Sequence, residues 1–192
     1  MLVENLRIPE VKLIRPVKHE DTRGYFSETY SKRDLAAAGI EIDFVQDNHV
    51  LSAERGTVRG LHFQIPPVPQ SKLVRVARGA VFDVAVDIRV GSPTFGEHVS
   101  AVVSAEAWNQ ILIPPGFAHG LVTLEPATEV IYKVSAAYSP EHDMGLLWND
   151  KALGIAWPVS EAEAIVSDKD KRQPKLADLP TYFRFEPAED QS

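Results

Sequence analysis

The sequence VFDVAVDIR, residues 81–89, alternates strictly in polarity. Successive side chains of a β-strand point to opposite faces, so this alternation predicts a strand with one apolar and one charged face. The apolar face holds Phe82, Val84, Val86 and Ile88, and the opposite face holds Asp83, Asp87 and Arg89. The same period of two recurs along most of the chain.

Further short runs extend this pattern in both directions. Residues 72–77 predict a strand that leads into an Arg78-Gly79 turn, and other strands are expected at residues 23–30, 44–50, 99–104, 110–113, 121–124 and 130–138. One helix is expected between a capping Ser31, with Asp34 three residues on, and a terminating Gly39. Many short strands separated by turns predict an antiparallel sandwich or barrel.

The composition indicates one globular domain over residues 1–192 with a few short helices, a helical or irregular region after Trp157-Pro158 and a frayed tail at residues 186–192. No apolar run approaches the roughly 20 residues of a membrane span, and no signal peptide is evident. Cysteine is absent, which fits a cytoplasmic protein. The net charge is −7 with no basic cluster, so nucleic-acid binding is not expected.

Two motifs specify the kind of barrel. Residues 113–120, IPPGFAHG, contain a Pro-x-Gly-x-x-His pattern similar to the second motif of cupins, which are all-β, double-stranded β-helix jelly rolls. Residues 59–64, RGLHFQ, would supply the motif that faces it inside the barrel. His62 and His119 alone are too few ligands for a stable metal site, so metal-free acid–base chemistry is expected.

Taken singly, the other polar residues have ordinary structural interpretations. A lone histidine such as His62 is more often a hydrogen-bonded core residue than a catalytic one. By parity Tyr132 shares a strand face with Val130, Val134 and Tyr138, which favours core packing.

Eight motifs, taken in order, change this interpretation. They are DTRGYFSE (21–28), FVQDNH (44–49), RGLHFQ (59–64), KLVRVARGAVFDVAVDIRVGSPTFG (72–96), IPPGFAHG (113–120), EVIYK (129–133), LLWND (146–150) and SDKD (167–170). Together they resemble the dTDP-4-dehydrorhamnose 3,5-epimerase family over roughly residues 10–175. Each motif alone is weak, whereas the ordered set is specific.

The resemblance implies a jelly-roll homodimer that converts dTDP-4-dehydro-6-deoxy-D-glucose to dTDP-4-dehydro-L-rhamnose in dTDP-L-rhamnose synthesis. By position, His62 is the general base, Tyr132 the general acid, Asp170 the residue that orients the histidine, and Lys72 the cation near the keto oxygen. The implied substrate contacts are Arg23 and Arg59 for the diphosphate, Phe26 and Tyr138 for stacking on thymine, and Glu28, Gln46, Asp47, Asn48, His119 and Lys169. The strand at residues 21–28 crosses to the partner subunit in this family. Asp143 stands where the family usually has Glu, with the same charge and a shorter reach.

The chemistry explains why these groups are needed. Carbons 3 and 5 flank a ketone, so a proton removed from either leaves an enolate. Inversion then needs a base on one face, an acid on the other and a cation at the oxygen. The ketone is itself the electron sink, so no cofactor or metal is expected.

Three alternatives stay open from the sequence. They are a related 3- or 5-mono-epimerase, a non-catalytic cupin that binds sugar nucleotides, and a metal-dependent dioxygenase. Parity also raises a conflict, because Arg59 and His62 fall on opposite faces of a regular strand. A bulge or sharp twist near Gly60 would reconcile them.

Overall fold

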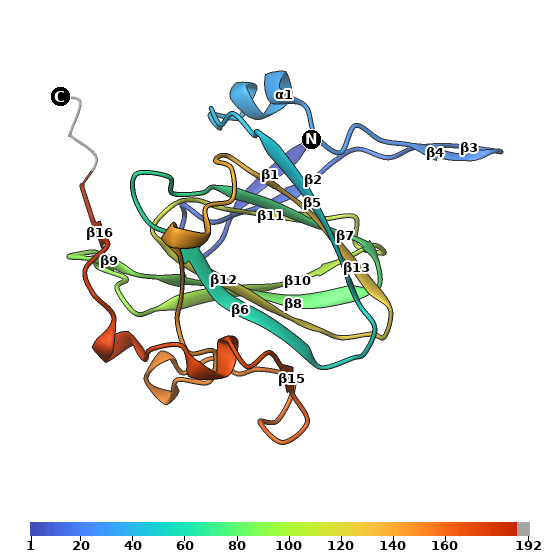
Figure 1. The fold of residues 1–192 in the computed structure, drawn as a ribbon. Helices are drawn as coiled ribbons and strands as arrows, with labels where there is room; N and C mark the ends of the chain where they lie inside the picture. The colour runs from blue at the N-terminus through green and yellow to red at the C-terminus, as the bar shows by residue number, and fades with distance from the viewer. Residues whose placement is uncertain (188–192) are drawn as a thin grey trace.

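Two antiparallel sheets face each other in the computed structural model, which describes residues 1–187 (Figure 1). The first sheet has the order β1 (Leu2–Asn5), β2 (Lys12–Arg15), β11 (Gln110–Ile113), β7 (Lys72–Arg78), β13 (Thr128–Val134), β5 (Gln46–Ser52). The second has the order β10 (His98–Ser104), β8 (Ala80–Asp87), β12 (Phe117–Thr123), β6 (Thr57–Gln64), β14 (Asp143–Gly145). Strands distant in sequence are therefore neighbours, and the expected all-β jelly roll is confirmed.

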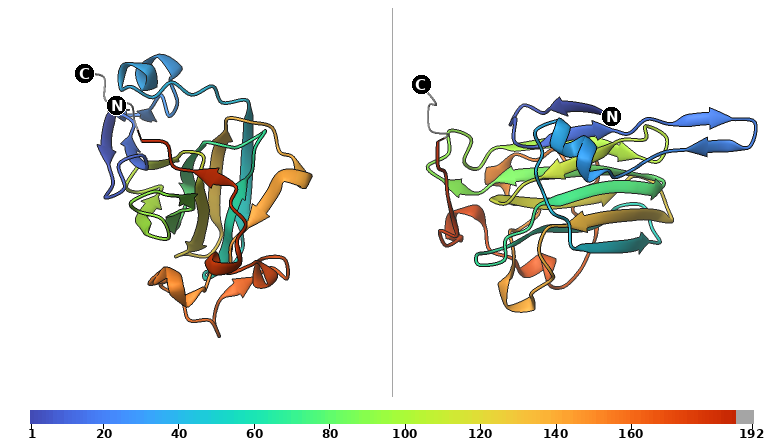
Figure 2. Two further views of the ribbon diagram at one scale, coloured as in Figure 1. Left: turned by 90° about the vertical axis from the view of Figure 1, so that its left-hand side faces the viewer. Right: turned by 90° about the horizontal axis from the view of Figure 1, so that it is seen from above.

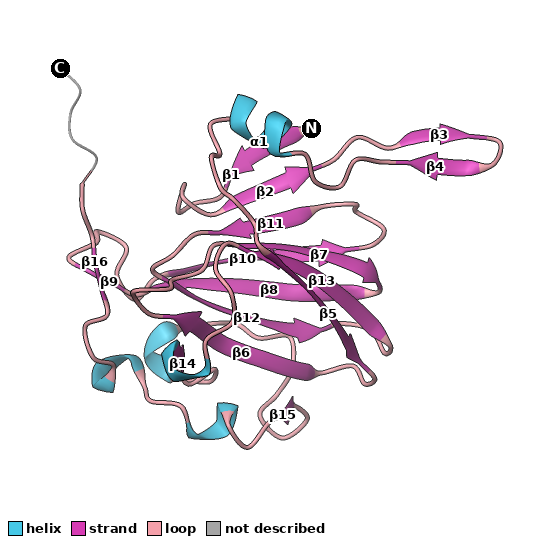
Figure 3. Cartoon of the chain, turned by 45° about the horizontal axis from the view of Figure 1, so that its top comes forward, coloured by secondary structure: helices cyan, strands magenta, loops and turns pink. Residues whose placement is uncertain are grey.

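Smaller elements decorate this sandwich (Figure 3). They are the hairpin of β3 (His19–Asp21) and β4 (Gly24–Phe26), the parallel pair of β9 (Arg89–Val90) and β16 (Phe183–Arg184), β15 (Ile165–Val166), α1 (Lys32–Ala37) and the 3₁₀ turns η1 (Pro140–His142), η2 (Lys151–Leu153), η3 (Asp170–Arg172) and η4 (Leu176–Asp178). The β3–β4 hairpin projects away from the sheets, as Figures 1 and 3 and the right-hand view of Figure 2 show. In the described residues, no helix is long and apolar enough to cross a membrane.

The predicted helix is present as α1. The Ser31 hydroxyl accepts a hydrogen bond from the backbone N–H of Asp34, which satisfies one amide left free at the helix start. Gly39 follows the helix with a φ of +76°, a left-handed conformation that glycine adopts without strain.

Both faces of β8 are buried. Val81 and Ala85 pack in the core between the sheets, whereas Val84 and Val86 pack against the segment that follows β14. This C-terminal segment, residues 146–187, runs along the outside of the second sheet (Figure 1). The alternation separated the two faces correctly, but the face carrying Asp83 points between the sheets, where that carboxylate is fully buried.

Several predicted strand limits were wrong. Residues 23–30 contain only the short strand β4, because the chain then turns into α1. Strand β13 ends at Val134, so Tyr138 does not share its face. Strand β12 begins earlier than predicted, at Phe117, and β5 is shifted to Gln46–Ser52. Alternation of polarity indicates which residues are extended, but it does not show where hydrogen bonding to the neighbouring strand ends. Of the predicted frayed tail, residues 188–192 lie outside the described part of the chain.

Candidate active site

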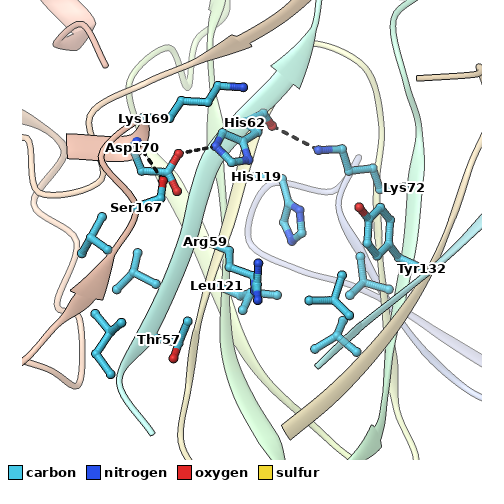
Figure 4. Close-up of a pocket in the computed structure, with 16 residues that line it drawn as sticks. Thr57, Arg59, His62, Lys72, His119, Leu121, Tyr132, Ser167, Lys169 and Asp170 are labelled. Atoms are coloured by element: carbon cyan, nitrogen blue, oxygen red, sulfur yellow. Dashed lines mark hydrogen bonds and ion pairs between the residues drawn. The ribbon is translucent and has the colours of Figure 1, made fainter. Parts of the chain in front are cut away.

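A cavity of about 500 Å³ opens between the two sheets (Figure 4). Its lining combines an apolar wall with a cluster of ionisable groups. The lining residues are Val50, Thr57, Val58, Arg59, His62, Lys72, Val74, His119, Leu121, Val130, Tyr132, Ile165, Val166, Ser167, Lys169 and Asp170. An apolar cavity with a few convergent polar groups is typical of a small-molecule site.

His62 on β6 is hydrogen-bonded to Asp170 at the start of η3, with 2.6 Å between His62 Nε2 and Asp170 Oδ1. Asp170 is buried, and its other oxygen accepts the Gly60 backbone N–H at 3.4 Å. Burial alone would raise the pKa of the Asp170 carboxyl, but the interactions with His62 and the hydrogen bonds from Gly60 and Ser167 together outweigh it, so the pKa is lowered. The carboxylate therefore occupies Nε2 and leaves Nδ1 as the ring nitrogen outside this hydrogen bond.

A β-bulge resolves the parity conflict between Arg59 and His62. Strands β6 and β12 pair His62 with His119 and Arg59 with Leu121, so two residues of β6 lie opposite Gly120 alone. The extra residue turns both Arg59 and His62 toward the cavity. The predicted irregularity near Gly60 is confirmed.

Lys72 and Tyr132 enter the cavity from the first sheet, opposite the wall that carries His62 (Figure 4). The Lys72 ammonium donates to the backbone carbonyl of His62 at 3.2 Å. Burial lowers the pKa of Lys72 to about 8, and the charges of Asp143 and Asp83 only partly oppose this. Burial also raises the pKa of the Tyr132 phenol, so its hydroxyl carries a proton at neutral pH.

A second histidine–carboxylate pair lies beside the first. His119 Nε2 lies 2.9 Å from Asp83 Oδ2, and both side chains come from neighbouring strands of the second sheet. The sequence arguments selected His119 but did not select Asp83 as a site residue. The signal was present, because Asp83 is a carboxylate on the β8 face that also carries core residues.

Other selected residues lie at the rim of the cavity or away from it. Lys169 donates to Asp143 Oδ2 at 2.6 Å, and this hydrogen bond raises the pKa of Lys169. The exposed Tyr138 donates to the same oxygen at 3.3 Å, so Asp143 links two loops although it does not line the cavity.

The polar stretch at the start of β5 divides between two faces. Gln46 donates to Asn48 Oδ1 at 2.8 Å, and Asn48 pairs with Tyr132 across the strands. Asp47 alternates to the opposite face, where it forms an ion pair with Lys133 at 2.7 Å.

Residues of the projecting hairpin and its continuation do not reach the cavity of their own chain. Arg23 forms an ion pair with Asp21, and its side chain is 88% exposed. Phe26 and Glu28 are also exposed. Within residues 1–187, no three His, Asp or Glu side chains converge as metal ligands.

Known proteins are similar to this chain in both sequence and fold. The family model for dTDP-4-dehydrorhamnose 3,5-epimerase matches residues 5–178. A relative of that name from Sinorhizobium fredii is 53% identical over 185 residues, covering 96% of this chain and 94% of the relative.

Two solved structures are similar over nearly their full length. The Bacillus anthracis dTDP-4-dehydrorhamnose 3,5-epimerase with TDP and PPi bound is 48% identical with a TM-score of 0.88, covering 91% of this chain and 98% of that one. A Legionella pneumophila dTDP-6-deoxy-D-glucose-3,5-epimerase in complex with dTDP-4-keto-L-rhamnose is 40% identical with a TM-score of 0.90, covering 96% and 98%. By sequence, fold and the length of the match, this chain belongs to the dTDP-4-dehydrorhamnose 3,5-epimerase family.

Proposed function

We propose that His62 and Tyr132 carry out the 3,5-epimerase activity of this family, an isomerisation in dTDP-rhamnose biosynthesis. The substrate is dTDP-4-dehydro-6-deoxy-D-glucose and the product dTDP-4-dehydro-L-rhamnose. One observation carries the assignment of roles: His62 and Tyr132 line the same cavity from opposite sheets. A sugar ring between them has a base on one face and a phenolic proton on the other.

Each inversion begins with proton transfer from carbon 3 or carbon 5 to His62 Nδ1, since Nε2 is held by Asp170. The electron pair of the broken C–H bond moves onto the carbon 4 oxygen, and the Lys72 ammonium stabilises the resulting enolate. Tyr132 then protonates the same carbon from the opposite face. The imidazolium and the phenolate return to their starting forms by exchange with solvent before the second carbon reacts.

Arg59 supports binding of the diphosphate. Its guanidinium lies on the cavity wall and is held by hydrogen bonds to Ser52 Oγ at 3.0 Å and to the Leu51 carbonyl at 3.2 Å. A planar guanidinium binds phosphate oxygens in pairs. Lys169 adds a second cation at the rim, and Gln46, Asn48, His119 and Tyr138 are further proposed contacts.

In a homodimer, the projecting hairpin could contact the cavity of the partner subunit. Arg23, Phe26 and Glu28 are exposed in the single chain, and their hairpin extends away from the sheets (Figure 2). We propose that it reaches the partner's cavity, where Arg23 meets the diphosphate and Phe26 packs on thymine. An exposed aromatic residue beside an arginine suits such a contact.

Subunit mixing tests this exchange of strands. Arg23→Ala and His62→Ala dimers should each be poorly active. After dissociation and reassociation of an equal mixture, half of the dimers are mixed, and each mixed dimer has one intact site. About a quarter of wild-type activity should therefore return. No recovery, despite proven subunit exchange, would place Arg23 and His62 of each site in one chain.

Incubation with dTDP-4-dehydro-6-deoxy-D-glucose in deuterated water tests the reaction itself. Proton NMR of the product should show deuterium at both carbon 3 and carbon 5 together with the L-rhamno configuration. Exchange and inversion at one carbon only would instead assign a mono-epimerase, which uses the same base and acid. Binding of dTDP without any exchange would indicate a non-catalytic protein.

A further inference from the structure

The bulge in β6 depends on two glycines that face each other across strands. Gly60 has a φ of +112°, and a Cβ built on it would lie 2.6 Å from the His119 carbonyl oxygen. Gly120 lies in β12 with an ordinary φ, yet a Cβ there would lie 2.9 Å from the Arg59 carbonyl oxygen and 3.0 Å from Leu61 Cδ2. Real Cβ atoms essentially never approach backbone this closely, so neither position has room for a side chain.

The bulge has a second consequence, which concerns hydrogen bonds. Backbone groups at a bulge lose their partners on the neighbouring strand and must find others. The N–H of Gly60 is directed at Asp170 Oδ2, at 3.4 Å. Leu61 exchanges backbone hydrogen bonds with Leu146 at 2.9 and 3.3 Å. The irregular backbone is therefore joined to the carboxylate that holds His62.

We propose that Gly60 and Gly120 are positioning residues of this active site. Their close contact sets the bulge that turns Arg59 and His62 to the same side, and the bulge supplies a backbone donor to Asp170. One local irregularity thereby fixes the distance between the diphosphate-binding group and the general base. This proposal rests on the roles proposed above for Arg59 and His62.

Gly120→Ala is the sharper of the two possible tests. The position has no left-handed φ, so the added methyl group acts only by crowding Arg59 and Leu61. A shift of about 1 Å in a catalytic group can cost roughly 100-fold in rate. We therefore expect kcat/KM to fall roughly 100-fold. We also expect dTDP to bind roughly 10-fold more weakly, because a displaced Arg59 would lose a charged hydrogen bond to the diphosphate.

Gly79→Ala is the matched control for damage to the barrel. Gly79 lies in the turn between β7 and β8, away from the cavity lining, and its Cβ would lie 2.5 Å from Thr128 Oγ1. This variant should lower Tm yet keep the wild-type kcat, KM and dTDP affinity of the folded protein. A structural role for Gly120 would make the two variants behave alike.

Kinetics, calorimetric titration with dTDP and thermal unfolding of both variants decide the matter. Wild-type kinetics in Gly120→Ala, or activity lost only in proportion to unfolded protein, overturns the proposal. If Gly120→Ala does not fold, the double variant with Leu61→Val removes Cδ2 and leaves the contact with Arg59 to be tested against Leu61→Val alone. Turnover by the wild-type protein tests the proposed function separately.

Discussion

Two histidine–carboxylate pairs face the same cavity, and they differ in what holds the carboxylate. Asp83 belongs to a barrel strand and is fully buried, and its partner His119 is 10% exposed. Asp170 comes from the C-terminal segment, and its partner His62 is 31% exposed. Similar chemistry thus occurs in a rigid, enclosed setting and in an accessible one. The greater accessibility of His62, rather than the presence of a carboxylate partner, favours it over His119 as the proposed base.

The largest expected effect separates the two histidines. His62→Ala removes the only group assigned to proton abstraction, which should lower kcat roughly 100- to 10,000-fold while dTDP binding and Tm stay near wild type. His119→Ala should mainly raise KM, because that side chain is assigned to substrate contact. Steady-state kinetics with calorimetric titration distinguish the two outcomes. Equal losses of kcat in both variants would mean that the pairs share the chemistry.

Tyr132→Phe tests whether the proposed acid acts from the face of the sugar opposite the His62–Asp170 pair. The ring still fills its space, but protonation from the opposite face should fail, lowering inversion roughly 100-fold. Because His62 still removes protons, substrate protons should continue to exchange in deuterated water. NMR should detect exchange without inversion. If Tyr132 were only a packing residue, the loss would be about 1 kcal/mol of stability and inversion would continue.

The carboxylates should differ by a smaller margin. Asp170→Asn no longer fixes the tautomer of His62, and kcat should fall roughly 100-fold, the lower end of what a positioned base contributes. Asp83→Asn disturbs a histidine assigned to substrate contact rather than to proton transfer, so kcat should fall less than about 10-fold. Both substitutions preserve side-chain volume, and Tm measured in parallel controls for folding. A greater loss of kcat in Asp83→Asn would reverse the assignment of the pairs.

A pH profile examines the cation that lies between the two sheets. The pKa of Lys72 is lowered to about 8, so the ammonium form is present below that pH and is lost as the pH rises through it. kcat/KM should therefore decline above pH 8 by a few-fold per pH unit. In Lys72→Arg the side chain stays charged, and the remaining activity should not show this decline. An unchanged alkaline limb in the variant would exclude Lys72 as its source.

Chelation should have no effect, which completes the series. His62 and His119 are opposite each other across β6 and β12, so a metal shared by the two pairs is the remaining alternative. Each imidazole already binds its own carboxylate, and no third side chain converges on them within residues 1–187. Activity measured after exhaustive dialysis against a chelator should equal that of untreated enzyme. Loss that a divalent ion restores would show that the pairs cooperate as ligands.

Features set by local sequence could be predicted, whereas features that depend on a neighbouring strand could not. Strand β8 and the capped helix α1 were predictable because periodicity and a capping serine act locally. The facing of His62 and His119 followed from two motifs of a known barrel. Asp83 was missed because alternation separates two faces without telling which one lies inside. The use of Gly60 was only inferred from a conflict of parity, since a bulge depends on the neighbouring strand.

The position of the C-terminal segment affects the order in which the active site is assembled during synthesis. The strands of the two large sheets are complete by β14, at residue 145, whereas residues 165–170 supply the last part of the cavity wall, including Asp170, and β15 must still pair with β6. A growing chain can therefore pair the strands of its two sheets before it can complete the cavity wall or orient His62. The carboxylate that holds His62 is made late in synthesis, so we expect a chain interrupted between these points to lack both part of the cavity wall and the group that orients the proposed base.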